Sequence, residues 1–403
     1  MKPTSYKISE LCEIVRGVSF SKSEAKSTFF DGSLPIIRAG SIQRNLELDK
    51  DLLWIHGDKI KEKQKIKKND ILMCMSSGSS HLVGKTAISH SDWNGGFGAF
   101  CALLRVINNH CLPKYLYYIL NSDNFLNWST CSAGSNIKNI RVSELNDFTI
   151  KLPSIDDQMT IVNLMDKVSC IRQKREDAIK VANDFLYSVF LDMFGDPIIN
   201  PKGFGIRLLK DFFIDEKNGT KCGPFGSALK KDEYSKVGVP VWSMDNITLK
   251  GDFIDSPSLW ISEDKYRELN SYSVLDGDVI ISRAGTVGKM GVVRSNSPKS
   301  IISTNLIRVR FSEKLYPEYF VSLMTYCKGR VGNLKTGPDG AFTHMNTGVL
   351  SNLEFPYPPL ELQRKYNQIR QNVMSLIDKY NNYGHRIDET FYAINQKAFL
   401  GKP

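Results

Sequence analysis

Apolar positions along the chain follow two different periods. Short apolar runs at 34–42, 70–75 and 102–107 are separated by Gly, Ser and Asn, a pattern typical of strands joined by turns. From residue 156 onward the apolar side chains recur every three or four positions instead, which is the period of an amphipathic helix. The first half of the sequence therefore predicts a strand-rich part followed by a long helix.

Shorter elements lie within the strand-rich part. Residues 113–121 and their counterparts at 317–326 both begin with Pro. Proline suits the first turn of a helix, because that position donates no helical hydrogen bond. Residues 148–152 form the last predicted strand of the first half, and Pro153 ends it.

The same order of elements occurs twice. Landmarks of the first half return in the same order about 205 residues later. A repeat of this size is a whole domain rather than a solenoid module. We therefore expect two similar halves. The paired landmarks are Leu34-Pro35 with Val239-Pro240, Asp70-Ile71 with Asp278-Val279, Gly84-Lys85 with Gly288-Lys289, Pro113 with Pro317, and Gln158 with Gln363.

Two stretches carry the helical period. The first starts at Asp156-Asp157, which suit a helix N-terminus, and stops at Gly195. The second follows Pro358-Pro359, and Gly384 weakens it enough that we expect a kink there. At about 1.5 Å per residue each helix is roughly 55–60 Å long. A heptad stripe of that length needs a partner helix.

We expect the two long helices to be each other's partner, packed as an antiparallel coiled coil with pseudo-two-fold symmetry. The alternative is that each helix covers only its own domain. The predicted fold class is α+β, with strand-rich domains at 1–153 and 197–357 and spacer helices at 154–196 and 358–403. The predicted coiled-coil residues are Ile161, Leu164, Val168, Ile171, Phe185, Ile369, Val373, Leu376, Tyr380, Ile387 and Ile394.

Composition indicates a globular protein with an acidic partner. The 403 residues are 41% hydrophobic and 24% charged, and the net charge is +10. This charge favours nucleic acid first and an anionic membrane surface second. The 8 cysteines show no C-x-x-C spacing, and no run of 18 apolar residues occurs. We therefore expect a reduced, cytoplasmic protein.

The tandem arrangement resembles the specificity subunit of type I restriction–modification systems. Two variable mixed domains, each followed by a long helix, are typical of that family. The residues that carry the resemblance are the exits into the helices, Leu152-Pro153…Gln158 and Tyr357-Pro358-Pro359…Gln363. The paired turns Asn69-Asp70 and Gly277-Asp278 and the Gly-Lys pairs downstream of them also match.

The resemblance implies a division of labour between the parts of the chain. Each mixed domain would be a target-recognition domain that reads one half of a split, asymmetric site on double-stranded DNA. The helices would set the distance between the half-sites and dock two copies of the methyltransferase subunit. Partner subunits, with or without a restriction and translocation subunit among them, would supply the catalysis, and this chain would need no cofactor of its own.

Candidate DNA-contacting residues lie in loops that follow the predicted strands. Ser and Thr hydroxyls, lysines and glycines suit phosphates and close backbone approach, and arginine can read guanine with two hydrogen bonds. The alternative for each loop is an ordinary polar hairpin. The candidates are Arg38, Ser41, Gln43, Arg44, Ser76, Ser77, Ser79, Lys85, Lys138, Arg141, Ser243, Asn246, Arg283, Thr286, Lys289, Lys335 and His344.

No motif of the sequence indicates catalysis or a metal. A phosphate-binding loop needs a glycine five residues before Gly84, and Ser79 occupies that position, so Gly84-Lys85-Thr86 does not complete the motif. The histidines show no metal-ligand spacing. Tyr357-Pro358-Pro359-Leu360 lacks both ends of an amino-methyltransferase motif. Two alternatives remain open: a stand-alone DNA-modifying enzyme, and a repeat-containing adaptor that binds proteins.

Overall fold

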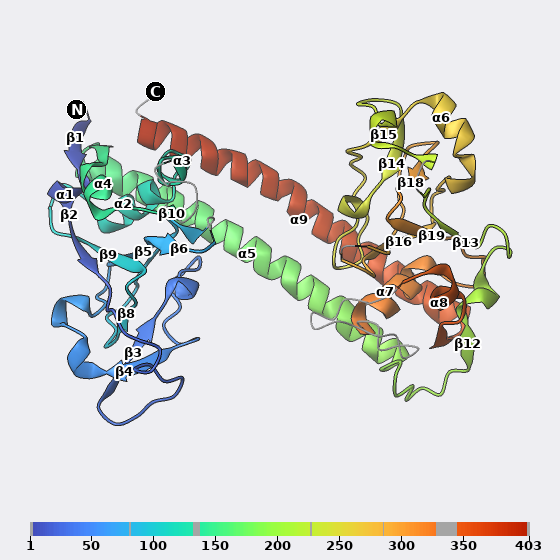
Figure 1. Cartoon of the computed structure of the whole chain (residues 1–403), viewed down its shortest axis with the longest axis horizontal. Coiled ribbons are helices and arrows are strands. Elements are labelled where there is room, and N and C mark those ends of the chain that lie inside the picture. The colour runs from blue at the N-terminus through green and yellow to red at the C-terminus, as the bar shows by residue number, and fades with distance from the viewer. Residues whose placement is uncertain are drawn as a thin grey trace. The chain divides into compact units, whose positions relative to one another are not determined.

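In a computed structural model, the chain divides into two compact units. The structure describes residues 3–79, 82–131, 138–225, 228–284, 286–327 and 345–400. Unit 1 is Met1–Glu176 with Asn381–Pro403, and unit 2 is Asp177–Tyr380. Two long helices, α5 (Ile155–Phe194) and α9 (Leu360–Leu400), run through both units (Figure 1). Each unit therefore contains part of both helices.

Unit 1 contains a four-stranded antiparallel sheet in the order β2-β9-β5-β7 and a three-stranded sheet in the order β4-β3-β8. Short ladders join β1 to β11 and β6 to β10. Its elements are β1 (Thr4–Lys7), α1 (Ile8–Leu11), β2 (Cys12–Arg16), β3 (Ser33–Ile37), β4 (Leu53–His56), β5 (Ile71–Cys74), β6 (Ser76–Ser77), β7 (Thr86–Ile88), β8 (Gly96–Phe97), β9 (Cys101–Val106), α2 (Pro113–Leu120), α3 (Asp123–Cys131), β10 (Lys138–Asn139), α4 (Val142–Asp147) and β11 (Thr149–Leu152).

Unit 2 repeats this topology. Its four-stranded sheet has the order β13-β19-β16-β17, its three-stranded sheet the order β15-β14-β18, and β12 pairs with β20. Its elements are β12 (Ile206–Leu208), β13 (Thr220–Cys222), β14 (Val239–Trp242), β15 (Trp260–Ile261), α6 (Glu263–Glu268), β16 (Val279–Ser282), β17 (Met290–Val292), β18 (Ile301–Ile302), β19 (Leu306–Val309), α7 (Pro317–Cys327), α8 (Thr347–Ser351) and β20 (Glu354–Pro356).

The register of strand pairing repeats as well. In unit 1, Ile36 of β3 lies opposite Gly96 of β8 in a parallel pair. In unit 2, Val241 of β14 lies opposite Ile301 of β18, also in parallel. Val241 follows Ile36, and Ile301 follows Gly96, by the same shift along the chain that separates the sequence landmarks. The prediction of two similar strand-rich domains, each followed by a long helix, is confirmed.

Strand β5 lies in the middle of the core of unit 1. Ile71 and Met73 point into one buried cluster, which also contains residues of α2, α4 and α5. Leu72 and Cys74 point into a second cluster with residues of β3 and β8. A strand that is covered on both faces reads as a continuous apolar run rather than an alternating one, which explains the sequence pattern at 71–75.

Helices α5 and α9 contact each other and run antiparallel within unit 1. Arg172 Nε lies 2.9 Å from a carboxylate oxygen of Asp388, and the Arg172 guanidinium also covers the ring of Phe391. One turn further along α5, Arg175 lies against Gly384. Residue numbers thus rise along one helix while they fall along the other. Helix α9 continues through Gly384, and a Cβ at that position would collide with the Arg175 guanidinium.

The buried face of the helices is displaced by one residue from several of the predicted positions. Val168 is buried as predicted, but Leu164, Ile171, Phe185 and Leu376 are 44%, 50%, 52% and 46% exposed. The buried neighbours are Val162, Met165, Leu186 and Ile377. The remaining predicted positions, Ile161, Ile369, Val373, Tyr380, Ile387 and Ile394, are partly buried.

This displacement has a simple cause. Ile161-Val162 and Leu164-Met165 place two apolar stripes side by side on α5, and both have the helical period. The sequence pattern alone cannot choose between them. Helices α5 and α9 lie within the predicted spacer segments 154–196 and 358–403. The division of the chain into four domains at 153/154, 196/197 and 357/358 remains a prediction. No helix in the described parts of the chain is long and apolar enough to cross a bilayer.

Candidate nucleic-acid interface

In unit 1 the Gly-Lys turn meets the loop that follows strand β3. That loop opens with a 3-10 turn at Ala39–Ser41. Lys85 donates a hydrogen bond from Nζ to Oε1 of Gln43 at 3.0 Å. Gly84 has φ of 85°, a left-handed conformation that glycine adopts without strain and that directs the chain back toward the loop. Two loops that lie far apart in the sequence thus form one surface.

Unit 2 builds the corresponding surface. Its 3-10 turn is Met244–Asn246, and Lys289 donates from Nζ to the Met244 carbonyl oxygen at 3.2 Å. Gly288 has φ of 86°, nearly the value of Gly84. The structure therefore brings together, in each unit separately, the strand loop and the Gly-Lys turn that the sequence analysis selected.

A buried ion pair recurs at the start of the corresponding central strand in both units, β5 in unit 1 and β16 in unit 2. Asp70 accepts from Nε and Nη2 of Arg105 at 2.9 and 2.6 Å. In unit 2, Asp278 accepts from Arg310 at 2.7 and 2.7 Å. Both aspartates are only 2% exposed. The hydrogen bond and charge of Asp70 raise the pKa of Arg105. These aspartates belong to the turns that revealed the repeat, so the landmark has a structural role.

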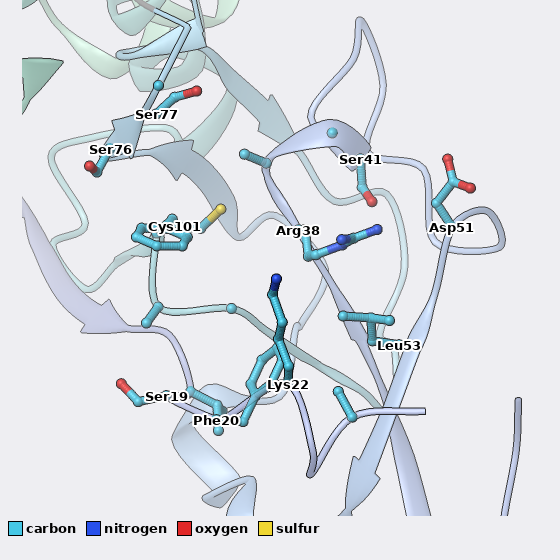
Figure 2. Close-up of a pocket in the computed structure, with 18 residues that line it drawn as sticks. Ser19, Phe20, Lys22, Arg38, Ser41, Asp51, Leu53, Ser76, Ser77 and Cys101 are labelled. Atoms are coloured by element: carbon cyan, nitrogen blue, oxygen red, sulfur yellow. The ribbon is translucent and has the colours of Figure 1, made fainter. Parts of the chain in front are cut away.

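An open cleft of about 1210 Å3 lies beside the loop surface of unit 1 (Figure 2). Lys22 extends its amino group into it, and Arg38 and Ser41 form one wall. Ser76 and Ser77 lie on the opposite wall. The polar and charged groups of the cleft, which include these serines, Arg38 and Lys22, stand among a larger apolar lining that contains Phe20, Leu53 and Phe100. These polar and charged groups suit phosphate oxygens and base edges.

The predicted DNA-contacting residues of unit 1 differ in how exposed their side chains are. Arg38 and Ser79 are exposed, while Ser76 and Ser77 are half-buried. Ser41 is only 5% exposed although it lines the cleft. Strand β6, which carries Ser76 and Ser77, pairs with the backbone of β10, and Lys138 lies on that strand.

Arg44 is engaged by helix α5 within unit 1. Its Nη1 donates to Glu176 at 2.8 Å and to Gln173 at 3.1 Å, and its Nη2 donates to the carbonyl oxygen of Ser169 at 3.2 Å. With three partners on the helix, Arg44 fixes the loop to α5. This geometry favours a structural role over the predicted DNA contact.

Unit 2 presents Arg283, Thr286 and Lys289 from one loop. The Arg283 guanidinium stacks over the ring of Phe225, 4.2 Å from its centroid. Thr286 is exposed and Lys289 is half-buried. Ser243 precedes the 3-10 turn, and its hydroxyl accepts from the N–H of Asp245 at 3.2 Å.

Asn246 does not have the exposure that a DNA contact needs. It is 2% exposed, and its amide donates to the carbonyl oxygens of Ile254 and Ser256 at 3.0 Å each. Its Oδ1 accepts from the N–H of Ser243 at 2.9 Å. Asn246 therefore holds the loop from inside in this structure, and a direct DNA contact from it stays a prediction that its burial disfavours.

The remaining candidates are peripheral or lie outside the described residues. Arg141 has a side chain 76% exposed, 3.8 Å from Glu144. Lys335 and His344 fall in a segment that the structure does not describe.

Sequence reasoning missed three side chains at these surfaces. Lys22 lines the cleft of unit 1, and Phe100, which is 69% exposed, lines it as well. Phe225 carries the stacked arginine of unit 2 and is 56% exposed. No spacing or repeat in the sequence marked these three side chains as candidates.

The chemistry of these surfaces is that of binding. Among the described residues no group of three or more His, Cys, Asp or Glu is placed to hold a metal ion. Cys101 lines the cleft, but burial raises the pKa of its thiol to about 12, so it is not a thiolate nucleophile near neutral pH. Cations, hydroxyls and exposed aromatic rings are the groups that contact nucleic acids.

Comparison with known proteins identifies the class of this fold. Residues 3–181 and 201–382 match the family described as type I restriction modification DNA specificity domain. The type I restriction enzyme StySPI specificity subunit of Salmonella potsdam is 26% identical over 98% of this chain and 88% of its own length. The EcoKI specificity subunit of Escherichia coli strain K12 is 25% identical, with the same coverage of both chains.

Solved structures agree on the fold. The crystal structure of a type I restriction–modification S subunit from M. genitalium covers 99% of this chain and 96% of its own, at 16% identity and a TM-score of 0.58. A chain from a structure on complex assembly and conformational transition of the type I restriction–modification system gives a TM-score of 0.53 at 19% identity, covering 98% and 97%.

The chain therefore belongs to the type I restriction–modification DNA specificity family. It is a DNA specificity subunit, the non-catalytic component of such a system.

Proposed function

We propose that each unit reads one half of a two-part, asymmetric site on double-stranded DNA. The observation that carries this proposal is the pair of loop surfaces. Both units use the same strands and the same Gly-Lys turn to present a loop surface. The side chains on the two surfaces differ, because Arg38 and Ser76 have no identical counterpart in unit 2. Similar scaffolds with different side chains suit two different half-sites.

The long helices suit a second task, the docking of two methyltransferase subunits. In unit 1, helix α5 leaves Met159, Leu164 and Ile171 between 44% and 50% exposed. Exposed apolar side chains that recur along one helix are typical of a protein interface. A restriction and translocation subunit would join through the same complex. This part of the proposal rests on the family and on the exposed helix residues together.

The decisive experiment is to co-express the chain with its methyltransferase subunit and map methylated adenines across the host genome. We expect a gapped motif with two different halves. An ungapped or palindromic motif would count against one half-site per unit. Methylation by the purified chain alone would instead establish a stand-alone enzyme, and tight protein binding without DNA sequence preference would favour an adaptor.

A matched pair of lysines tests the proposed surface. Lys85→Ala should weaken binding of the assembled complex to DNA by a similar factor for every sequence and lower the salt slope by about one. The control is Lys7→Ala, since Lys7 pairs with Asp147 on the surface of unit 1 away from the loops. Equal effects of the two substitutions would remove Lys85 from the interface.

A further inference from the structure

The two units carry an arginine at different places on otherwise matching loops. Arg38 precedes the 3-10 turn of unit 1 with φ −125° and ψ 178°. Ser243 holds that position in unit 2 with φ −122° and ψ −180°. The backbones at these two positions are thus the same, and unit 2 has a serine where unit 1 has an arginine.

The arginine of unit 2 comes from the other loop. Arg283 follows β16 directly, and its N–H donates to the Asn305 carbonyl oxygen at 2.9 Å. In unit 1 the matching bond runs from the N–H of Met75 to the Phe100 carbonyl oxygen, also at 2.9 Å. Met75 is only 6% exposed. Among the described residues, the two units thus place an arginine that is not bound to helix α5 on opposite loops, Arg38 in unit 1 and Arg283 in unit 2.

Arg38 is free to bind a ligand in the cleft of unit 1. It is exposed, and no hydrogen-bond or ion-pair partner of its side chain occurs within the described part of the chain. Lys22 and Asp51 line the same cleft (Figure 2). An aspartate disfavours a phosphate but can accept from the amino group of cytosine, while arginine donates two bonds to guanine. Donors and an acceptor together suit the edge of a G·C pair.

The Arg283 side chain in unit 2 packs against the aromatic ring of Phe225. The carbon of the Arg283 guanidinium lies over the Phe225 ring, 4.2 Å from its centroid. Stacking of this kind fixes the guanidinium plane and leaves its N–H groups at the edge free to donate. Since Phe225 is itself 56% exposed, the stacked pair stands at the surface of unit 2.

We infer that each unit reads one guanine with one arginine, Arg38 in unit 1 and Arg283 in unit 2, presented from opposite loops of the same scaffold. This inference rests on the proposed function, because it assigns a base contact to surfaces proposed to face DNA. A bidentate arginine–guanine contact discriminates against the wrong base by about tenfold to a hundredfold.

The test uses the full chain assembled with its methyltransferase subunits. Arg38→Lys keeps the charge but loses the two-pronged geometry. We expect it to relax the methylation motif at one G·C position in one half only, by about tenfold or more in competition between matched oligonucleotides. Arg283→Lys should relax one G·C position in the other half only. Arg267→Ala is the control, because Arg267 is a surface arginine of unit 2 paired with Asp264.

Three outcomes would overturn the inference. The first is a wild-type half-site without any G·C pair. The second is an unchanged motif in both lysine variants. The third is an equal weakening on all sequences with a smaller salt slope, which is the behaviour of a phosphate contact. A failure of the proposed function can be distinguished from these outcomes, because the wild-type methylation motif would then not consist of two halves.

Discussion

Gln158 Oε1 accepts a hydrogen bond from the backbone N–H of Leu112 at 3.0 Å. In unit 2, Gln363 Oε1 accepts from the N–H of Tyr316, also at 3.0 Å. Both glutamines are 0% exposed. Each bond ties the first turn of a long helix to the residue that precedes the proline of a short helix. Two landmarks of the sequence repeat are therefore in direct contact within each unit.

Replacement of Gln158 should destabilise unit 1. Its Nε2 also donates to the carbonyl oxygens of His110 and Pro153, at 2.7 and 3.0 Å. Gln158→Leu keeps the size but leaves these buried groups unpaired, and each unpaired group costs about 1–3 kcal/mol. We expect a clear loss in the free energy of unfolding, measured in urea. The control Gln371→Ala changes an exposed glutamine of α9 and should have almost no effect. Equal losses would show that the buried bonds contribute little.

Neighbouring aspartates in unit 2 offer a second comparison. Asp278 forms the two-bond pair with Arg310 and is 2% exposed, so Asp278→Asn leaves a buried guanidinium without its counter-charge. We expect a loss of about 3–5 kcal/mol in the free energy of unfolding. Asp276→Asn breaks the pair with Arg294 at the surface, where the Asp276 side chain is 60% exposed, and should cost about 0–1 kcal/mol. The reverse order would contradict the structural role given to the repeated aspartate.

Adjacent residues of α5 test which face of the helix is buried. Met165 is 0% exposed, whereas Leu164 is 44% exposed. Met165→Ala should lower the free energy of unfolding by about 2–5 kcal/mol, since it removes packed atoms from the core. Leu164→Ala should cost about 1 kcal/mol or less. Thermal unfolding of both variants provides the measurement. A larger loss for Leu164 would restore the face predicted from the sequence.

Helix length should set the gap in the DNA site. An insertion of one heptad into α5, matched by one in α9, lengthens both helices by about 10 Å at 1.5 Å per residue. DNA rises by about 3.4 Å per base pair, so the gap should grow by about three base pairs. Methylation mapping in cells that express the lengthened chain checks this. An unchanged gap, with both half-sites retained, would exclude the helices as the spacer.

The scattered spacing of the cysteines favoured a reduced protein, and this stays a prediction; Cys12, Cys74, Cys101 and Cys111 lie in buried positions. Hydrophobic spacing also predicted the long helices and several of the strands, because burial of one face imposes a period that is visible in the chain. The Gly-Lys turns were found for a similar reason, since they recur at a constant shift.

The candidate site was harder to predict in detail. Arg44 and Asn246 have the residue types of DNA contacts, but one is bound to α5 and the other is buried. Lys22 and Phe225 carried no pattern of their own and were missed. Whether a polar side chain faces a ligand or a neighbouring loop depends on contacts between segments that lie far apart in the chain, and local spacing does not encode those contacts.

The sequence by itself determined the repeat, the strand-rich domains with their long helices, and the resemblance to a specificity subunit. These features follow from periodicity and from ordered landmarks, which survive without coordinates. Only the tertiary structure decided which stripe of α5 is buried, which polar residues support the loops, and which arginine stands at each surface. The physical reason is that two apolar stripes satisfy the same period, and only packing against the rest of the unit selects one of them.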